Sequence, residues 1–137
     1  MSSLFKIGLT TSVYDFLSLD QFLSTSRDID PDWSFQPFSG SVRLGDGTLF
    51  GTGFHVAKWR WNGMEDLHRQ TLKELVSPGL SGPVYIQTAT NDVDIYNSIV
   101  FKTYACVMNW PTEDEDFQAD KVLGLILTFT HLVEELV

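Results

Sequence analysis

Gly53 to Val76, GFHVAKWRWNGMEDLHRQTLKELV, contains two hydrophobic periodicities in succession. In the first half, Ala57, Trp59 and Trp61 alternate with charged residues, and this period of two predicts a half-buried β-strand. In the second half, apolar residues recur at helical spacing, which predicts an amphipathic helix. The residues expected to face the sheet are Met64, Leu67, Thr71, Leu72, Leu75 and Val76. We expect this strand and helix to form the centre of the domain.

Both ends of the predicted helix carry recognisable signals. Asn62 stands three residues before Glu65, which predicts a cap at the start of the helix and a reciprocal carboxylate. The residues 77–79, Ser-Pro-Gly, predict the end of the helix, because proline and glycine interrupt helical backbone. His68 is expected on the exposed face.

The composition limits the possible functions. The 137 residues are about one domain in length, and a net charge of −9 argues against a nucleic-acid-binding surface, so DNA is expected only in transient passage. No apolar run approaches the ~20 residues of a membrane span, and the N-terminus has no signal-peptide pattern. We therefore expect a protein made without Sec export. A single cysteine, Cys106, excludes an internal disulfide and is predicted to be a small buried hydrophobe.

Residues 1–37 are predicted to form an ordered arm outside the domain, which would span residues 38–137. Large apolar residues alternate there with Ser, Thr and Asp, and they need a surface on this domain or on a neighbouring copy. We expect the neighbouring copy. The interface candidates are Phe5, Tyr14, Phe16, Leu17 and Phe22. Asp28, Asp30 and Asp32 alternate as in a calcium loop, but Trp33 and Ser39 replace the required Gly and Glu, so a solvated linker is predicted.

The remainder of the chain predicts strands joined mostly by turns. Asp46-Gly47 indicates a hairpin, and further strands are expected at 84–88, 99–108 and 122–133. In the last strand, one face is expected to carry Leu123, Leu125, Leu127 and Phe129, and the opposite face Leu132. Five or six strands and one helix predict an α+β, mainly β fold, an antiparallel β-sandwich or split barrel with one flanking α-helix. The core candidates are Trp59, Trp61, Leu67, Leu72, Leu75, Leu125 and Leu127.

The sequence contains no pattern typical of a catalytic site. His55, His68 and His131 lack the paired spacing of metal ligands, and no serine has the context of a nucleophile elbow. The glycines at 45, 47, 51 and 53 precede no helix and no Lys-Ser/Thr pair, so they do not predict a phosphate site. No catalytic, cofactor-binding or metal-binding residue is therefore predicted, and we expect a protein that is not an enzyme.

Several segments in order resemble small tail proteins of long-tailed bacteriophages, namely lambda-type tail-tip minor tail proteins and the N-terminal ring domain of distal tail proteins. The segments are SVRLGDG at 41–47, AKWRW at 57–61, the helix, VYIQT at 84–88, ACVMNWP at 105–111 and the closing apolar strand. The resemblance covers residues 38–135. It implies a tail-tube-like fold and a ring of identical subunits, for which six is one stoichiometry, around the tail lumen. It also implies contacts with tail tube and hub proteins, location in the virion tail after synthesis in the host cytoplasm, and no catalytic residues.

Two hypotheses from other classes stay open at this point. A carbohydrate-binding module would stack sugars on surface Trp33, Trp59, Trp61, Trp110 and tyrosines. Against it, Trp59 and Trp61 share a strand face with Ala57, which suits a core or a subunit interface equally well. A small enzyme would need a concave site assembled from residues distant in sequence.

Overall fold

A computed structural model describes residues 4–12, 14–23, 30–38, 40–77, 79–112, 116–118 and 121–135. These residues form ten strands and two helices, and every strand pair is antiparallel. The elements are β1 (Lys6–Gly8), β2 (Leu17–Ser18), α1 (Leu19–Phe22), β3 (Asp32–Gln36), β4 (Gly40–Arg43), β5 (Leu49–Thr52), β6 (His55–Glu65), α2 (Asp66–Lys73), β7 (Ser81–Val93), β8 (Ile99–Asn109), β9 (Asp116–Gln118) and β10 (Lys121–Glu134).

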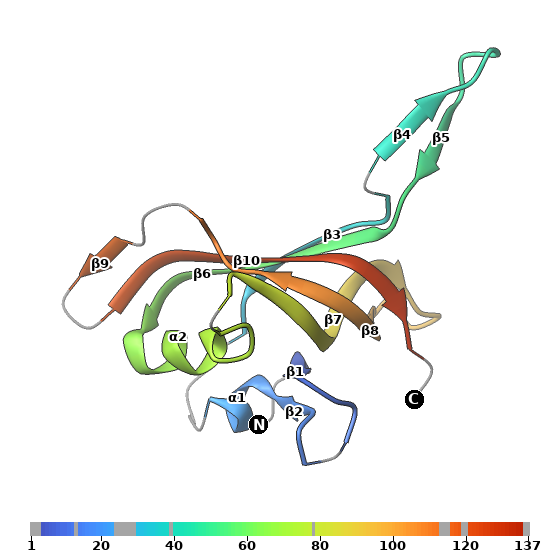
Figure 1. The fold of residues 1–137 in the computed structure, drawn as a ribbon. Coiled ribbons are helices and arrows are strands. Elements are labelled where there is room, and N and C mark those ends of the chain that lie inside the picture. The colour runs from blue at the N-terminus through green and yellow to red at the C-terminus, as the bar shows by residue number, and fades with distance from the viewer. Residues whose placement is uncertain are drawn as a thin grey trace.

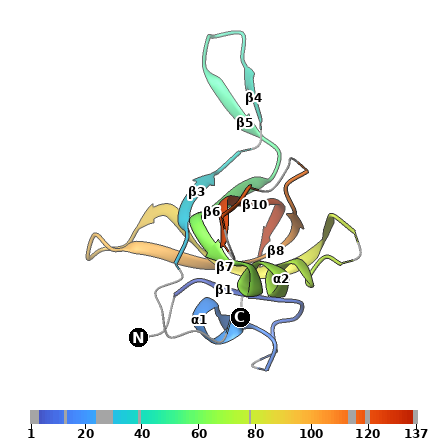
Figure 2. The same ribbon diagram turned by 90° about the vertical axis from the view of Figure 1, so that its left-hand side faces the viewer.

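One sheet of eight strands makes up most of the molecule. Its order is β2-β1-β7-β8-β10-β6-β3, with β9 paired to β10, while β4 and β5 form a separate two-stranded sheet. The large sheet curls so that β6 and β7 face one another across the core (Figures 1 and 2). Asn91 in β7 donates a 2.6 Å hydrogen bond to the carbonyl of Phe35 in β3, which links strands far apart in the sheet order. The predicted mainly β, antiparallel, sandwich-like fold is confirmed, although the strands outnumber the five or six expected.

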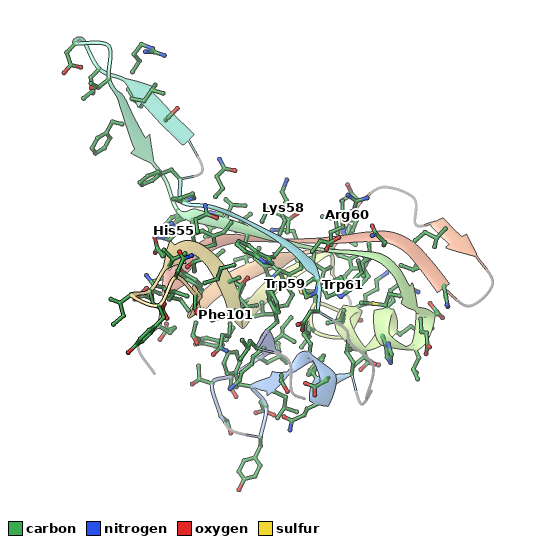
Figure 3. All side chains as sticks on the ribbon, turned by 180° about the vertical axis from the view of Figure 1, so that it is seen from behind. His55, Lys58, Trp59, Arg60, Trp61 and Phe101 are labelled. Carbon is green, nitrogen blue, oxygen red and sulfur yellow. The ribbon has the colours of Figure 1, made fainter. Side chains whose placement is uncertain are left out.

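Tryptophan 59 occupies the centre of the core. Its ring makes edge contacts with Phe5, Trp61 and Phe129 at centroid distances of 5.5, 6.2 and 4.7 Å. Figure 3 shows Trp59 and Trp61 pointing inward from β6, while Lys58 and Arg60 point away from the core. The alternation in the sequence therefore predicted this strand face correctly. Of the remaining core candidates, Leu72, Leu125 and Leu127 are buried and Leu75 is partly buried.

The start of α2 differs from the predicted cap. Strand β6 continues through Asn62 to Glu65, and Glu65 is the N-cap residue, without a side-chain capping bond. The expected Asn62 cap was wrong because Asn62 lies within a strand paired to β10, where it is remote from the first turn of the helix. Asp66 acts in the first turn instead, accepting hydrogen bonds from Arg69 at 3.0 Å and from Gln70 at 2.7 Å.

The buried face of α2 is rotated from the expected one. Leu67, a predicted core residue, is 69% exposed, whereas His68, expected on the exposed face, is buried. Both predictions were wrong. The helix presents His68, Leu72 and Leu75 to the sheet at i, i+4 and i+7, and Leu67 lies one residue, about 100°, outside this stripe.

The faces of β10 change along its length, contrary to the simple alternation expected. Gly124 has a φ of 67°, and on its two sides Val122 and Leu125 are buried while Leu123 is exposed. His131 has a φ of 57° at a register shift between Phe129 and Leu132. The shift turns Leu132 into the core beside Phe129. Leu123 and Leu132 were therefore assigned to the wrong faces.

The described part of the N-terminal segment belongs to the domain. Strand β1 pairs with β7 in the large sheet, and β2 pairs with β1. Phe5, Ile7, Leu19 and Leu23 are buried in the same core as Trp59. For these residues, the predicted domain boundary at residue 37 was therefore wrong, and so was the predicted arm that packs on a neighbouring copy. The residues of β7 that pair with β1 lie about eighty residues away in sequence, beyond the reach of any local pattern. The Asp28 position of the rejected calcium loop lies outside the described residues.

Candidate assembly surface

The hairpin formed by β4 and β5 projects beyond the large sheet (Figures 1 and 2). Val42 pairs with Phe50, and Arg43 pairs with Leu49. Directly opposite residues of antiparallel strands point to the same side, so Val42 and Phe50 occupy one face of the hairpin and Arg43 and Leu49 the other. Each face therefore carries at least one large apolar side chain.

The turn of the hairpin is fixed by local hydrogen bonds. Gly47 has a φ of 92°, which suits glycine, and the amide of Leu44 donates to the carbonyl of Thr48 at 2.7 Å. The Asp46 carboxylate accepts from the Thr48 hydroxyl at 2.7 Å and from the Thr48 amide at 3.0 Å. These bonds lower the pKa of Asp46. Arg43 donates to the carbonyl of Gly47 at 2.7 Å, so the tip has a defined conformation.

Aromatic residues surround the base of the hairpin. His55 lies near the rings of Phe35 and Phe38, at centroid distances of 5.4 and 6.5 Å, and its Nδ1 is hydrogen-bonded to the carbonyl of Pro37. A hollow of about 400 Å³ lies beside Phe38 and Leu49. The base is thus anchored to β6, whereas the outer part of the hairpin is not packed on the large sheet.

Apolar side chains of the hairpin face solvent. Leu49 is 62% exposed and Phe50 is 60% exposed, and Val42 and Leu44 are exposed as well. Several exposed large apolar side chains on one projecting element are typical of interaction sites in soluble proteins. The sequence predicted the hairpin from Asp46-Gly47, but its projection was missed. The available signal was the presence of large apolar residues on both sides of the turn.

A second apolar cluster lies at the tip between β7 and β8. Val93, Ile95, Tyr96 and Ile99 are all exposed there, with Ile95 at 91%. Asp94 fixes this turn by accepting hydrogen bonds from the amides of Tyr96 and Ser98 at 2.8 and 3.0 Å. The sequence pattern did not indicate this cluster, because it predicted a strand that ends at residue 88, before the tip.

The interface candidates of the N-terminal segment differ in their burial. Phe5 is buried against Trp59 and Phe101, so it is a core residue and the prediction of an interface role was wrong. Phe16 and Leu17 are partly buried, and Phe22 packs against the core. Tyr14 is exposed. Groups of exposed large apolar side chains lie instead on the β4–β5 hairpin and on the β7–β8 tip.

The titratable residues do not gather into one centre in the described part of the chain. His68 is buried on α2, His55 lies at the hairpin base and His131 contacts the ring of Phe54. Among the described residues, no group of three His, Cys, Asp or Glu side chains is placed to hold a metal ion. The Cys106 thiol donates to the carbonyl of Val84, and burial raises its pKa to about 12, so it is protonated at neutral pH.

One charged cluster lies where β8 begins and where β7 and β10 end. The Lys102 ammonium is 3.4 Å from Glu134 and 3.6 Å from Asp92. Burial raises the pKa of Tyr104 to about 12, and the two carboxylates add to the shift. The cluster joins three strands and consists of exposed or half-exposed ion pairs, which is typical of a structural role.

A scan against protein-family models, a search of curated proteins and a search of solved structures each found no match for this chain. Neither of the helices described has the length and apolar character needed to cross a membrane.

Proposed function

We propose that this protein is a structural component of a bacteriophage tail that forms a homo-oligomeric ring at or near the tail tip and connects the tail tube to the hub or baseplate. The observation that carries the proposal is the projecting β4–β5 hairpin with its exposed apolar side chains. The kind of assembly, a ring in a phage tail, is proposed from the resemblance to tail proteins. This resemblance is found in segments 41–47, 57–61, 84–88 and 105–111.

The β4–β5 hairpin is unusual because it is a two-stranded sheet separate from the large sheet. A two-stranded hairpin is marginally stable at best in water, and among the strands that the structure describes β4 and β5 pair only with each other. Burying one large apolar side chain contributes roughly 1.5–3 kcal/mol before the cost of association. Val42, Leu44, Leu49 and Phe50 are 46–62% exposed, so each would contribute a part of this stabilisation when an interface covers it.

A second copy of the chain is the proposed occupant of this surface. The protein carries a net charge of −9, so like charges oppose self-association over most of its surface. The hairpin contains one Arg and one Asp and is formally neutral, so charge does not oppose contact there. A neutral apolar projection on an acidic protein therefore favours binding to another copy.

The β7–β8 tip provides the complementary surface in this proposal. It differs from the hairpin in residues and in position, so a hairpin-to-tip contact joins two unlike patches. Such heterologous contacts generate closed rings when the rotation between copies closes. The ring would surround a lumen through which DNA passes transiently.

The structure gives less support to a carbohydrate-binding module. Trp59, Trp61 and Trp110 are buried and Trp33 is partly buried, so these four rings do not form a sugar-stacking surface. Tyr14 and Tyr96 are exposed, but they belong to different loops.

Negative-stain electron microscopy and native mass spectrometry of the purified protein test the assembly, and mass spectrometry of purified phage tails tests its place. The expected result is a closed ring with a central channel and a fixed, low copy number per tail. A monomer at every concentration, or absence of the protein from tails of the phage that encodes it, would contradict the proposal.

The hairpin-to-tip contact has its own test. Leu49→Asp in the hairpin and Ile95→Asp in the tip should each abolish the ring. Each variant retains one intact surface, so an equimolar mixture should form a heterodimer through the intact tip of the first and the intact hairpin of the second. A mixture that stays monomeric would show that the hairpin binds elsewhere.

A further inference from the structure

A cavity of about 420 Å³ lies on the outer face of the sheet, over β2, β1, β7 and β8. Its floor is a row of polar side chains in register. Lys6 is paired with Ser18 and with Gln87, and Gln87 is paired with Thr103. The neighbours of Lys6 in sequence, Phe5 and Ile7, are buried in the core, so Lys6 and its row point outward.

The loop between β1 and β2 forms one wall of the cavity. Thr11 and Phe16 line it from this side. Backbone amides of Asp15 and Phe16 donate to the carbonyl of Ser12 at 3.0 and 2.8 Å, which holds the loop in a turn. Gly8 permits the close approach, because a Cβ at this position would clash with the carbonyl of Asp15. The wall of the cavity is therefore a hydrogen-bonded turn that packs closely against β1.

Two polar groups in the cavity lack the partners that such groups normally have. The Lys6 ammonium lies 5.8 Å from the centre of the Phe16 ring and forms no ion pair with any residue the structure describes. Ser18 is only 4% exposed, and its Oγ has no hydrogen-bond partner in the described structure. A buried hydroxyl without a partner is unfavourable, so this pair is suited to accept a ligand.

We propose that this cavity binds a carboxylate group, with Lys6 supplying the positive charge and the Ser18 hydroxyl a hydrogen bond. A carboxylate carries one negative charge, which matches the single cation of the lining. A phosphate dianion would add a second negative charge to a protein of net charge −9. Phe16 and Leu17 provide an apolar wall for the carbon skeleton of the ligand.

The Gln87 side chain makes the floor more selective. Its Nε2 donates to the carbonyl of Leu4 at 2.7 Å, which fixes the amide plane beside Lys6. Thr103 adds a hydroxyl at the far end of the row. The cavity can accept either a free small acid or the C-terminal carboxylate of a peptide, since both present the same group.

Nuclear magnetic resonance titration of the full-length protein tests this assignment. The probes are propionate, inorganic phosphate, and one short apolar peptide as its free acid and as its C-terminal amide. We expect saturable shifts of the amides of Lys6, Ser18, Gln87 and Thr103 with propionate or the peptide acid, and none with the peptide amide. A response to the peptide acid alone would identify a chain terminus as the source, and a response to propionate alone a free acid.

Variants distinguish binding in the cavity from a general effect of surface charge on carboxylate binding. Lys6→Met should weaken carboxylate binding by at least about tenfold, because a hydrogen-bonded charge is lost, and Ser18→Ala should weaken it by a smaller factor. Lys58→Met, which removes an exposed lysine from β6, is the matched control and should bind as the wild type does. Equal weakening by Lys6→Met and Lys58→Met, tighter binding of phosphate than of carboxylate, or no saturable shift would overturn the proposal.

Discussion

The indole Nε1 of Trp59 donates a 2.9 Å hydrogen bond to the Oγ1 of Thr88 inside the core. Both residues are fully buried, and they come from β6 and β7, which are not neighbours in the sheet. The bond therefore ties together the two walls of the curled sheet and gives the only polar atom of the Trp59 side chain a partner.

Thr88→Val should destabilise the fold by about 1–3 kcal/mol, because it keeps the shape of the side chain but leaves the Trp59 N–H unpaired. Thr88→Ser retains the acceptor and should cost less. Urea unfolding measured by tryptophan fluorescence gives both free energies of unfolding. Equal stability of Thr88→Val and the wild type would mean that this bond contributes nothing.

The rotated face of α2 leads to a paired prediction. Leu72 is fully buried, so Leu72→Ala should cost about 2–5 kcal/mol through lost burial and a cavity. Leu67 is exposed, so Leu67→Ala should change the free energy of unfolding by no more than about 0.5 kcal/mol. Thermal or urea unfolding compares the two variants. Equally large losses of stability in the two variants would restore the helix face that the sequence pattern predicted, with both leucines against the sheet.

The packing of the N-terminal segment predicts that a truncated chain cannot fold. Deletion of residues 1–23 removes β1, β2 and α1 and exposes the core around Trp59. We expect loss of cooperative unfolding in calorimetry and loss of amide dispersion. The control replaces residues 41–51 by a short glycine linker, which removes only the projecting hairpin and should preserve cooperative unfolding. A truncated chain that folds like the intact one would contradict the buried positions of Phe5 and Leu19.

Local patterns predicted the elements whose periodicity is uninterrupted. Ala57, Trp59 and Trp61 keep one face throughout, so β6 and the mainly β class were predictable. Gly124 and His131 interrupt the period of two in β10, and a bulge depends on pairing with β6 and β8, which the pattern of one strand does not contain.

The candidate surfaces were less predictable for a related reason. Apolar residues such as Leu49 and Phe50 look like core residues in sequence, because periodicity does not show whether a hairpin joins the large sheet or projects from it. Phe5 was predicted at an interface but lies in the core. Its partners Trp59 and Phe101 are distant in the chain, so no local pattern indicated this position.

The hairpin turn should show a measurable shift in proton affinity. Hydrogen bonds from Thr48 hold the pKa of Asp46 below its ordinary value of 3.8. The folded hairpin therefore favours the ionised carboxylate, and this contribution is present above that ordinary value and is lost as the pH falls through the lower, folded-state pKa. Carboxyl chemical shifts during an acid titration report the pKa, and Thr48→Val should raise it because the hydroxyl bond is lost. An unchanged pKa in Thr48→Val would show that the Thr48 hydroxyl does not hold the turn.

Sedimentation velocity on two matched leucine variants tests most directly the claim that the β4–β5 hairpin assembles this protein into a ring. Leu49→Asp and Leu67→Asp introduce the same charge at leucines of similar exposure, 62% and 69%, on the hairpin and on α2. The wild type and Leu67→Asp should sediment as one ring species, whereas Leu49→Asp should sediment as a folded monomer. A ring that persists in Leu49→Asp, or a wild type that remains monomeric, would contradict the account.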